Sequence, residues 1–174
     1  IRNMQRDSID WRAQKEWDYT LCDYYLHTED LPKAAEYLRK VIRHEMRSKQ
    51  RAREYFLLGQ IEAAMGNRQE AYNAFKKVVR QNPPYELEFN ARIAMTEVSA
   101  ARQAKKMIGR LRRMARNDNN KDYLDQVYYA IGNIYLAEKD TLHAIAAYET
   151  GNEKATRSGI EKGVLLLHLG DLYW

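Results

Sequence analysis

The stretch that decides the fold is AREYFLLGQIEAAMGNRQEAYNAFKKVVRQNPPY, which occupies residues 52–85. On both sides of Gly66-Asn67, apolar and small residues recur every three or four places, the spacing of an amphipathic helix. A glycine ends a helix readily because it adopts the left-handed conformation, and asparagine is a favoured N-cap for the next helix. Pro83-Pro84 then stops the second helix. The stretch therefore predicts two helices joined by a tight turn.

The same stretch resembles a tetratricopeptide repeat, a 34-residue helix–turn–helix unit. The matching places are the fourth, seventh, eighth, twentieth, twenty-fourth, twenty-seventh and thirty-second, occupied here by Tyr55, Leu58, Gly59, Ala71, Phe75, Val78 and Pro83. The eleventh place departs from the pattern, because Glu62 stands where tyrosine is usual. A generic helical bundle with chance glycines is the alternative, and so many matching places make it the weaker interpretation.

A second copy begins at Asp125 and shares the small and aromatic places of the first, through Tyr128, Ile131, Gly132, Tyr135, Ala144 and Tyr148. Weaker copies surround Cys22 and Ala94, and the last stretch around Gly170 looks like a first helix without a partner. The resemblance implies an all-α, tetratricopeptide-type α-solenoid of antiparallel helix pairs, about four and a half repeats in a right-handed superhelix. We expect one solenoid segment, residues 1–174, excised from a longer protein. The residues expected to pack the repeats are Cys22, Gly59, Ala71, Phe75, Pro83, Gly132, Tyr135, Ala144, Tyr148 and Gly170.

Helix ends are also predicted. Asp30 and Asp140 are expected N-caps of second helices, and Asn67 with Glu70 has the spacing of a capping box. Gly151 lies inside a predicted helix, where glycine costs about 1 kcal/mol relative to alanine, so we expect that helix to be bent or short.

The sequence offers no catalytic constellation. Its four histidines are not spaced as metal ligands, and it has no phosphate-binding glycine loop or nucleophile motif. Cys22, the single cysteine, precludes an internal disulfide and is expected to be a buried packing residue. We therefore predict no enzyme, no cofactor and no metal.

The net charge of +5 is a mild excess spread along the chain. Basic stretches run from Arg39 to Arg53 and from Arg102 to Arg116, and in the second the charges flank an apolar stripe. A solvated helix face or a protein contact is the favoured interpretation. A contact with phosphate or anionic lipid is the alternative, although no aromatic residues interleave to stack bases.

Two strings, NPPYELEFNARI (residues 82–93) and NKDYLDQVYYAIGNIYL (residues 120–136), resemble the PorW/SprE-type lipoproteins of the Bacteroidetes gliding and type IX secretion apparatus. The resemblance implies a non-catalytic scaffold at the periplasmic face of the outer membrane. Its partners would be other proteins of the secretion apparatus, and it would reach the membrane only through a lipid anchor outside this segment. Nucleic acid is not expected.

In this fold the second, fifth, ninth and twelfth places of each first helix are expected to line an inner groove. That rule selects Tyr19, Asp23, Arg53, Phe56, Gln60, Tyr129, Asn133 and Leu136 as the protein-binding groove. Aromatic side chains are frequent anchors of interfaces, so Phe56 and Tyr129 are expected to be the costliest to lose.

Two other functions stay open: a nucleic-acid-binding helical repeat, and a regulatory domain of a larger protein. The C-terminal helix around Leu166 is unusually apolar and is expected to mediate self-association or to be covered by further repeats.

Overall fold

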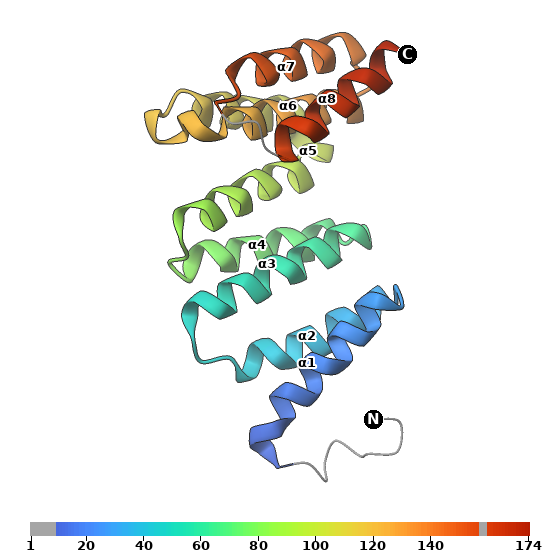
Figure 1. Cartoon of the computed structure of the whole chain (residues 1–174), viewed down its shortest axis with the longest axis vertical. Helices are drawn as coiled ribbons and strands as arrows, with labels where there is room; N and C mark the ends of the chain where they lie inside the picture. Colours follow the sequence, from blue (N-terminus) through green and yellow to red (C-terminus); the bar gives the residue numbers. More distant parts are fainter. Residues whose placement is uncertain (1–9, 157–159) are drawn as a thin grey trace. The chain divides into compact units, whose positions relative to one another are not determined.

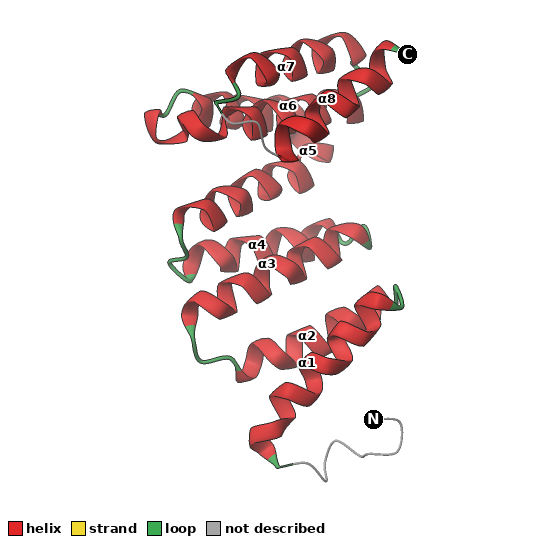
Figure 2. Ribbon diagram, in the orientation of Figure 1, coloured by secondary structure: helices red, strands yellow, loops and turns green. Residues whose placement is uncertain are grey.

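The computed structural model describes residues 10–156 and 160–174, and every regular element in these ranges is a helix (Figure 2). In chain order they are α1 (Trp11–His27), α2 (Leu31–His44), α3 (Ser48–Ala64), α4 (Arg68–Arg80), α5 (Tyr85–Ala115), the 3-10 helix η2 (Asp118–Tyr123), α6 (Leu124–Ala137), α7 (Thr141–Lys154) and α8 (Ile160–Tyr173). The backbone of Gln103 is non-helical, so α5 is two helices joined at a kink. The all-α fold class is confirmed.

Consecutive helices pack as pairs, as Figure 1 shows for α1 with α2 and for α3 with α4. The chain divides into two compact units, residues 1–95 and 96–174. The first, called the N-terminal unit, holds those two pairs. The second, called the C-terminal unit, holds the pair α6–α7 with α8 packed against both helices. Each pair is one helix–turn–helix repeat, as the sequence predicts.

A glycine of the first helix meets an aromatic ring of the second helix in two of these pairs. A Cβ atom added to Gly59 of α3 would lie 2.5 Å from Cε1 of Phe75 on α4. A Cβ atom on Gly132 of α6 would lie 2.2 Å from Cε1 of Tyr148 on α7. No side chain fits at such distances in a close-packed interior, so glycine is required where the ring lies on the backbone.

The first pair uses a smaller version of the same contact. Cys22 of α1 and Leu38 of α2 occupy the corresponding places, and both belong to one buried cluster with Ala34 and Ala35. The small thiol is combined with a leucine instead of an aromatic ring. The space between the two helices of a pair is filled either by glycine with an aromatic ring or by cysteine with leucine, as a close-packed core requires.

The turns of the three pairs have one geometry. In each turn, the N-cap residue of the second helix donates its backbone N–H to a backbone carbonyl oxygen of the first helix at 2.9 Å. These hydrogen bonds run from Asp30 to Tyr25, from Asn67 to Glu62 and from Asp140 to Tyr135. The residue before each of these caps is left-handed: Glu29 (φ 58°), Gly66 (φ 78°) and Lys139 (φ 62°). This hydrogen bond across a left-handed residue is the Schellman termination of a helix.

The expected N-caps are confirmed at two turns and wrong in detail at the third. Asp30 and Asp140 each accept a hydrogen bond from a backbone N–H of the first turn. Asn67 is at the N-cap position but makes no side-chain cap, so the capping box with Glu70 is absent. Its amide donates instead to Oε2 of Glu62 at 2.9 Å. The buried carboxylate is the stronger acceptor and takes the amide away from the helix end.

Glu62, the residue that departs from the repeat pattern, is an ionic link between neighbouring repeats. It is 1% exposed on α3, and it forms an ion pair with Arg39 of α2 in addition to the bond from Asn67. In the C-terminal unit the corresponding residue is Tyr135, whose hydroxyl accepts a hydrogen bond from Arg112 of α5. In both units an arginine from the preceding helix therefore contacts this place.

Gly151 does not shorten its helix, because α7 continues past it to Lys154. A Cβ atom on Gly151 would lie 2.7 Å from Cδ1 of Leu165 and 3.1 Å from Cβ of Tyr128. The glycine is required because α6 and α8 both approach the end of α7 at this point.

Gly132→Ala is expected to destabilise the C-terminal unit by about 1–3 kcal/mol, because Tyr148 is fully buried and cannot move aside. Gly170→Ala is the matched control, since nothing lies within 4 Å of its Cβ position and alanine is the better helix former. Thermal unfolding of both variants tests this. Equal midpoints for the two variants would contradict the packing described here.

Lys139→Gly is expected to stabilise the protein by about 1 kcal/mol, because the left-handed conformation is costly for a residue with a Cβ atom. Gly66→Ala, at the corresponding turn, is expected to destabilise by a similar amount. Urea unfolding measures both changes, and a stabilising Gly66→Ala would show that the turn tolerates another backbone geometry.

Candidate protein-binding groove

A pocket of about 160 Å³ opens between the first helices of the two N-terminal repeats. It is called the α1–α3 groove, and its lining residues are Tyr19, Cys22, Asp23 and Leu26 of α1, Leu38 of α2, and Gln50, Arg53, Glu54 and Leu57 of α3. Both walls are helices whose other faces are fixed in the buried cluster of the unit. The groove is therefore held in shape by the packing of the repeats.

Three of the predicted groove residues lie together here. Tyr19 is 51% exposed, Arg53 is exposed, and the Asp23 side chain is 63% exposed. Asp23 also lies 3.6 Å from Nδ1 of His27 on the same helix. Gln60, the other predicted residue of α3, is exposed but does not line the groove. The exposed side chains of Tyr19, Asp23 and Arg53 can therefore contact a ligand at the rim.

Phe56 is half-buried, and its ring centroid lies 5.4 Å from that of Phe75. The side chain thus packs on the same ring that covers Gly59. Removing Phe56 would loosen the contact between α3 and α4 as well as any bound partner.

Tyr129 is held inside the C-terminal unit. Its hydroxyl lies 3.1 Å from Nε2 of His168 on α8, and its ring centroid lies 5.7 Å from that of Tyr148. Leu136, the last predicted residue of this helix, packs against a buried cluster with Leu165 and Leu169 of α8. Both side chains therefore contribute to the packing of α8 on α6.

Asn133 has its amide group satisfied from two directions. Its oxygen accepts a hydrogen bond from the Tyr148 hydroxyl at 2.7 Å, and its nitrogen donates to Glu97 of α5 at 3.2 Å. Burial raises the pKa of Glu97, against the opposing effect of the bond from Asn133. Burial, with the nearby Tyr129 and Glu97, also raises the pKa of Tyr148 to about 12. This network joins α5, α6 and α7 and leaves Asn133 little capacity for a ligand.

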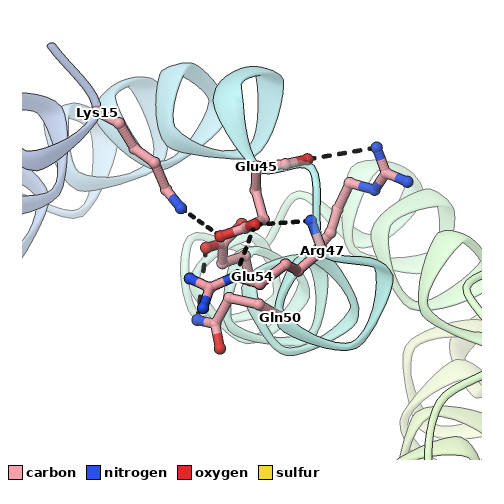
Figure 3. A network of polar contacts seen from close by, with 6 residues as sticks. Lys15, Glu45, Arg47, Gln50 and Glu54 are labelled. Atoms are coloured by element: carbon pink, nitrogen blue, oxygen red, sulfur yellow. Dashed lines mark hydrogen bonds and ion pairs between the residues drawn. The ribbon is translucent and has the colours of Figure 1, made fainter. Parts of the chain in front are cut away.

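A buried glutamate beside the α1–α3 groove joins α1 to the loop after α2 (Figure 3). Glu45 is 2% exposed and forms an ion pair with Lys15 of α1. Its other oxygen accepts from the backbone N–H of Arg47 at 2.8 Å and lies 3.4 Å from the Arg47 Nε. Burial alone would raise its pKa, but the hydrogen bonds from Lys15 and Arg47 outweigh burial and hold the pKa of Glu45 at about 2.

Glu54 is the groove residue that the sequence analysis missed. It is 4% exposed, and among the described residues its carboxyl group accepts one hydrogen bond, from the Gln50 amide at a long 3.5 Å. Burial is the main cause that raises its pKa, and the negative charge of Glu45 adds to it. No sequence signal could identify it, because glutamates are ordinarily exposed and the pattern of one repeat does not show which of them tertiary packing buries.

Cys22 also lines the groove, but burial, reinforced by the charge of Asp23, raises the pKa of its thiol to about 11. A thiol that is protonated at neutral pH is a poor nucleophile. Within residues 10–156 and 160–174, no group of histidine, cysteine and carboxylate side chains has the arrangement of a metal site. None of the described helices is long and apolar enough to span a membrane.

A second hollow in the N-terminal unit, of about 260 Å³, is lined by residues of α2, α3 and α4. It is lined by cations and anions together, among them Arg39, Arg43, Glu70 and Lys77. The basic stretch of α5 buries Leu111 and exposes its charged residues, as the predicted apolar stripe requires. The side chain of Arg102 lies outside the described residues. Neither surface has unpaired buried groups in the described part of the chain.

The comparison with known proteins supports the fold. The family model described as tetratricopeptide repeat matches residues 52–85 and 125–153. No curated protein sequence is significantly similar to the chain. Among solved structures, MamA (residue 41 to the end) from Desulfovibrio magneticus RS-1 has a TM-score of 0.59 at 21% identity, over 91% of this chain and 82% of that one. A double mutant of MamA from strain RS-1 has a TM-score of 0.58 at 19% identity, and the match covers 91% of this chain and 82% of that one. A further crystal structure of MamA has a TM-score of 0.56 at 18% identity, and the match covers 80% of this chain and 77% of that one.

The two buried glutamates near the groove are expected to respond to pH in opposite ways. The lowered pKa of Glu45 stabilises the fold above about pH 4.5, and this contribution is lost as the pH falls towards 2. The raised pKa of Glu54 costs stability once the pH exceeds 4.5 and the unfolded chain ionises. Glu45→Gln should therefore destabilise at pH 7, on the order of 2 kcal/mol for lost charged hydrogen bonds.

Glu54→Gln should instead raise the thermal midpoint at pH 8, and the gain should disappear at pH 4. Thermal scans of the wild type and both variants between pH 3 and pH 8 give the comparison. Parallel profiles for the two variants would show that the environments of the two carboxyl groups are alike.

Proposed function

We propose that the chain is a non-catalytic scaffold whose α1–α3 groove binds a segment of a partner protein. Its support is the groove itself, in which two rigid first helices present an exposed tyrosine, apolar walls and charged groups on one surface. Interfaces obtain energy from aromatic and apolar anchors and orientation from polar groups at the rim, and this lining supplies both. The tetratricopeptide fold is itself typical of protein-binding scaffolds, which is consistent with the proposal.

Tyr19 is the anchor that best tests the proposal. Phe56 and Tyr129 are packed against neighbouring helices, so their truncation would change stability and binding together. Tyr19 instead is half exposed at the groove. Tyr24, on the same helix, is 55% exposed and does not line the groove, which makes it the matched control.

Tyr19→Ala is expected to weaken the binding of a captured partner by about 2 kcal/mol, roughly thirtyfold, while Tyr24→Ala leaves the affinity unchanged. The partner would be captured with the wild-type segment as bait and then titrated by calorimetry. Equal affinities for the wild type and Tyr19→Ala would place the binding surface elsewhere.

The rival function, nucleic-acid binding through the basic stretches, is separated by salt. Phosphate contacts lose affinity steeply between about 50 and 200 mM salt, whereas a groove contact with an aromatic anchor persists. A partner whose binding survives at 200 mM and depends on Tyr19 favours the scaffold. If binding is lost when the charges of residues 105–116 are reversed and is unaffected by Tyr19→Ala, nucleic-acid binding is favoured.

The finer assignment is to the gliding and type IX secretion machinery at the periplasmic face of the outer membrane. Its support is the resemblance of residues 82–93 and 120–136 to PorW/SprE-type lipoproteins. The structure places these strings in α5 and its preceding turn, and in η2 with α6. Capture of a secretion-apparatus subunit from a cell envelope, sensitive to Tyr19→Ala, is the expected result. A partner from another compartment would refute the assignment and leave the scaffold function intact.

A further inference from the structure

The α1–α3 groove, whose binding role is the proposal above, contains one buried carboxyl oxygen without a partner. Glu54 lines the groove and is 4% exposed. Its Oε2 atom is buried and has no hydrogen-bond partner in the described part of the chain. An unsatisfied carboxylate in such a place is costly, so the folded protein favours either a protonated group or a bound cation.

The other buried glutamates of the N-terminal unit show what such a group requires. Glu62 is paired with Arg39, and Glu45 is paired with Lys15 and Arg47. Each of them thus has a cation from another part of the unit. Glu54 is similarly buried but has no ion pair with any residue that the structure describes, which distinguishes it from both.

The cations closest to Glu54 are already engaged. Figure 3 shows Lys15 and Arg47 directed at Glu45, with Gln50 alone reaching Glu54. Arg53 follows Glu54 directly in sequence. Adjacent residues of a helix do not face each other, and Arg53, which lines the same groove, is exposed and forms no ion pair with Glu54. Among the described residues of the unit, no cation is paired with Glu54, so a cation from a bound partner can take this place.

The walls of the groove fit the stem of a basic side chain. Leu26 and Leu57 supply apolar surface, and Tyr19 presents an exposed ring on which a guanidinium or ammonium group can lie. Asp23 adds a second carboxylate that is 63% exposed. We propose that the α1–α3 groove receives the side chain of an arginine or lysine from the partner segment, with Glu54 as the buried acceptor and Asp23 as the exposed one.

Such binding is linked to a proton. The groups that influence Glu54 are Glu45, Gln50, Lys15 and Arg47, and burial together with Glu45 raises its pKa. A bound cation favours the ionised carboxylate and displaces the proton. Affinity for a basic side chain is therefore higher at pH 8 than at pH 5, while the charge of arginine is the same at both values.

The test uses small probes with the intact chain. Nα-acetyl-L-arginine amide is compared with Nα-acetyl-L-citrulline amide, which has the same shape without the charge. Amide chemical shifts in ¹⁵N-labelled protein are followed during each titration. The arginine probe should shift the signals of Gln50, Glu54 and Leu57 and bind at least about tenfold more tightly than the citrulline probe. Equal affinities for the two probes would overturn the proposal.

Glu54→Gln keeps the size of the side chain and removes its charge, so the arginine probe should bind this variant no better than citrulline. Glu36→Gln, an exposed acid on α2 paired with Lys40, is the control and should leave the preference unchanged. A preference that persists in folded Glu54→Gln would contradict the role of Glu54. If that variant does not fold, the comparison of pH 5 with pH 8 on the wild type decides, and an unchanged affinity refutes the proposal.

The outcome is separable from that of the proposed function. A partner protein that depends on Tyr19, combined with no arginine preference, would leave the groove as a binding site and remove only the cation pocket. If the arginine preference depends on Glu54 but Tyr19→Ala does not weaken the binding of any partner protein, the cation pocket stands and the proposed partner-binding function falls.

Discussion

The contact on which the fold depends is a ring lying directly on a helix backbone. Phe75 and Tyr148 cover Gly59 and Gly132, and in each case an added Cβ atom would lie less than 3 Å from the ring. This contact sets the distance and register of the two helices in a pair, because the ring has no other place in a close-packed core. Once the pairs are fixed, the opposite faces of the first helices are fixed as well. The α1–α3 groove is a consequence of packing on its far side.

The links between consecutive repeats are polar as well as apolar. An arginine from the preceding helix contacts Glu62 in the N-terminal unit and Tyr135 in the C-terminal unit. The N-terminal unit further ties Glu45 to Lys15. A buried ion pair adds little net stability when both partners are satisfied, but a buried charge whose partner is missing is costly. Glu54 is the residue at which this rule is left unfulfilled, and it lies in the groove.

The sequence predicts those features that depend on the pattern of one repeat. The helices, the turn at Gly66 and the two aspartate caps all follow from local spacing, and the structure bears them out. Features that depend on neighbouring repeats were not predictable. The repeat position predicts that Tyr129 lines the groove, but not that His168 of α8 meets its hydroxyl. Gly151 appears unfavourable in one helix and is needed only because two others approach it. The burial of Glu54 likewise does not follow from its position in one repeat.

The most direct test of the groove is photo-crosslinking in the native cell. A p-benzoyl-phenylalanine residue is placed at Tyr19, inside the groove, or at Tyr24, on the same helix but outside it. The account predicts one discrete crosslinked partner from the groove position and none from the control. A partner that crosslinks equally from both positions, or only from Tyr24, would show that the α1–α3 groove is not the binding surface.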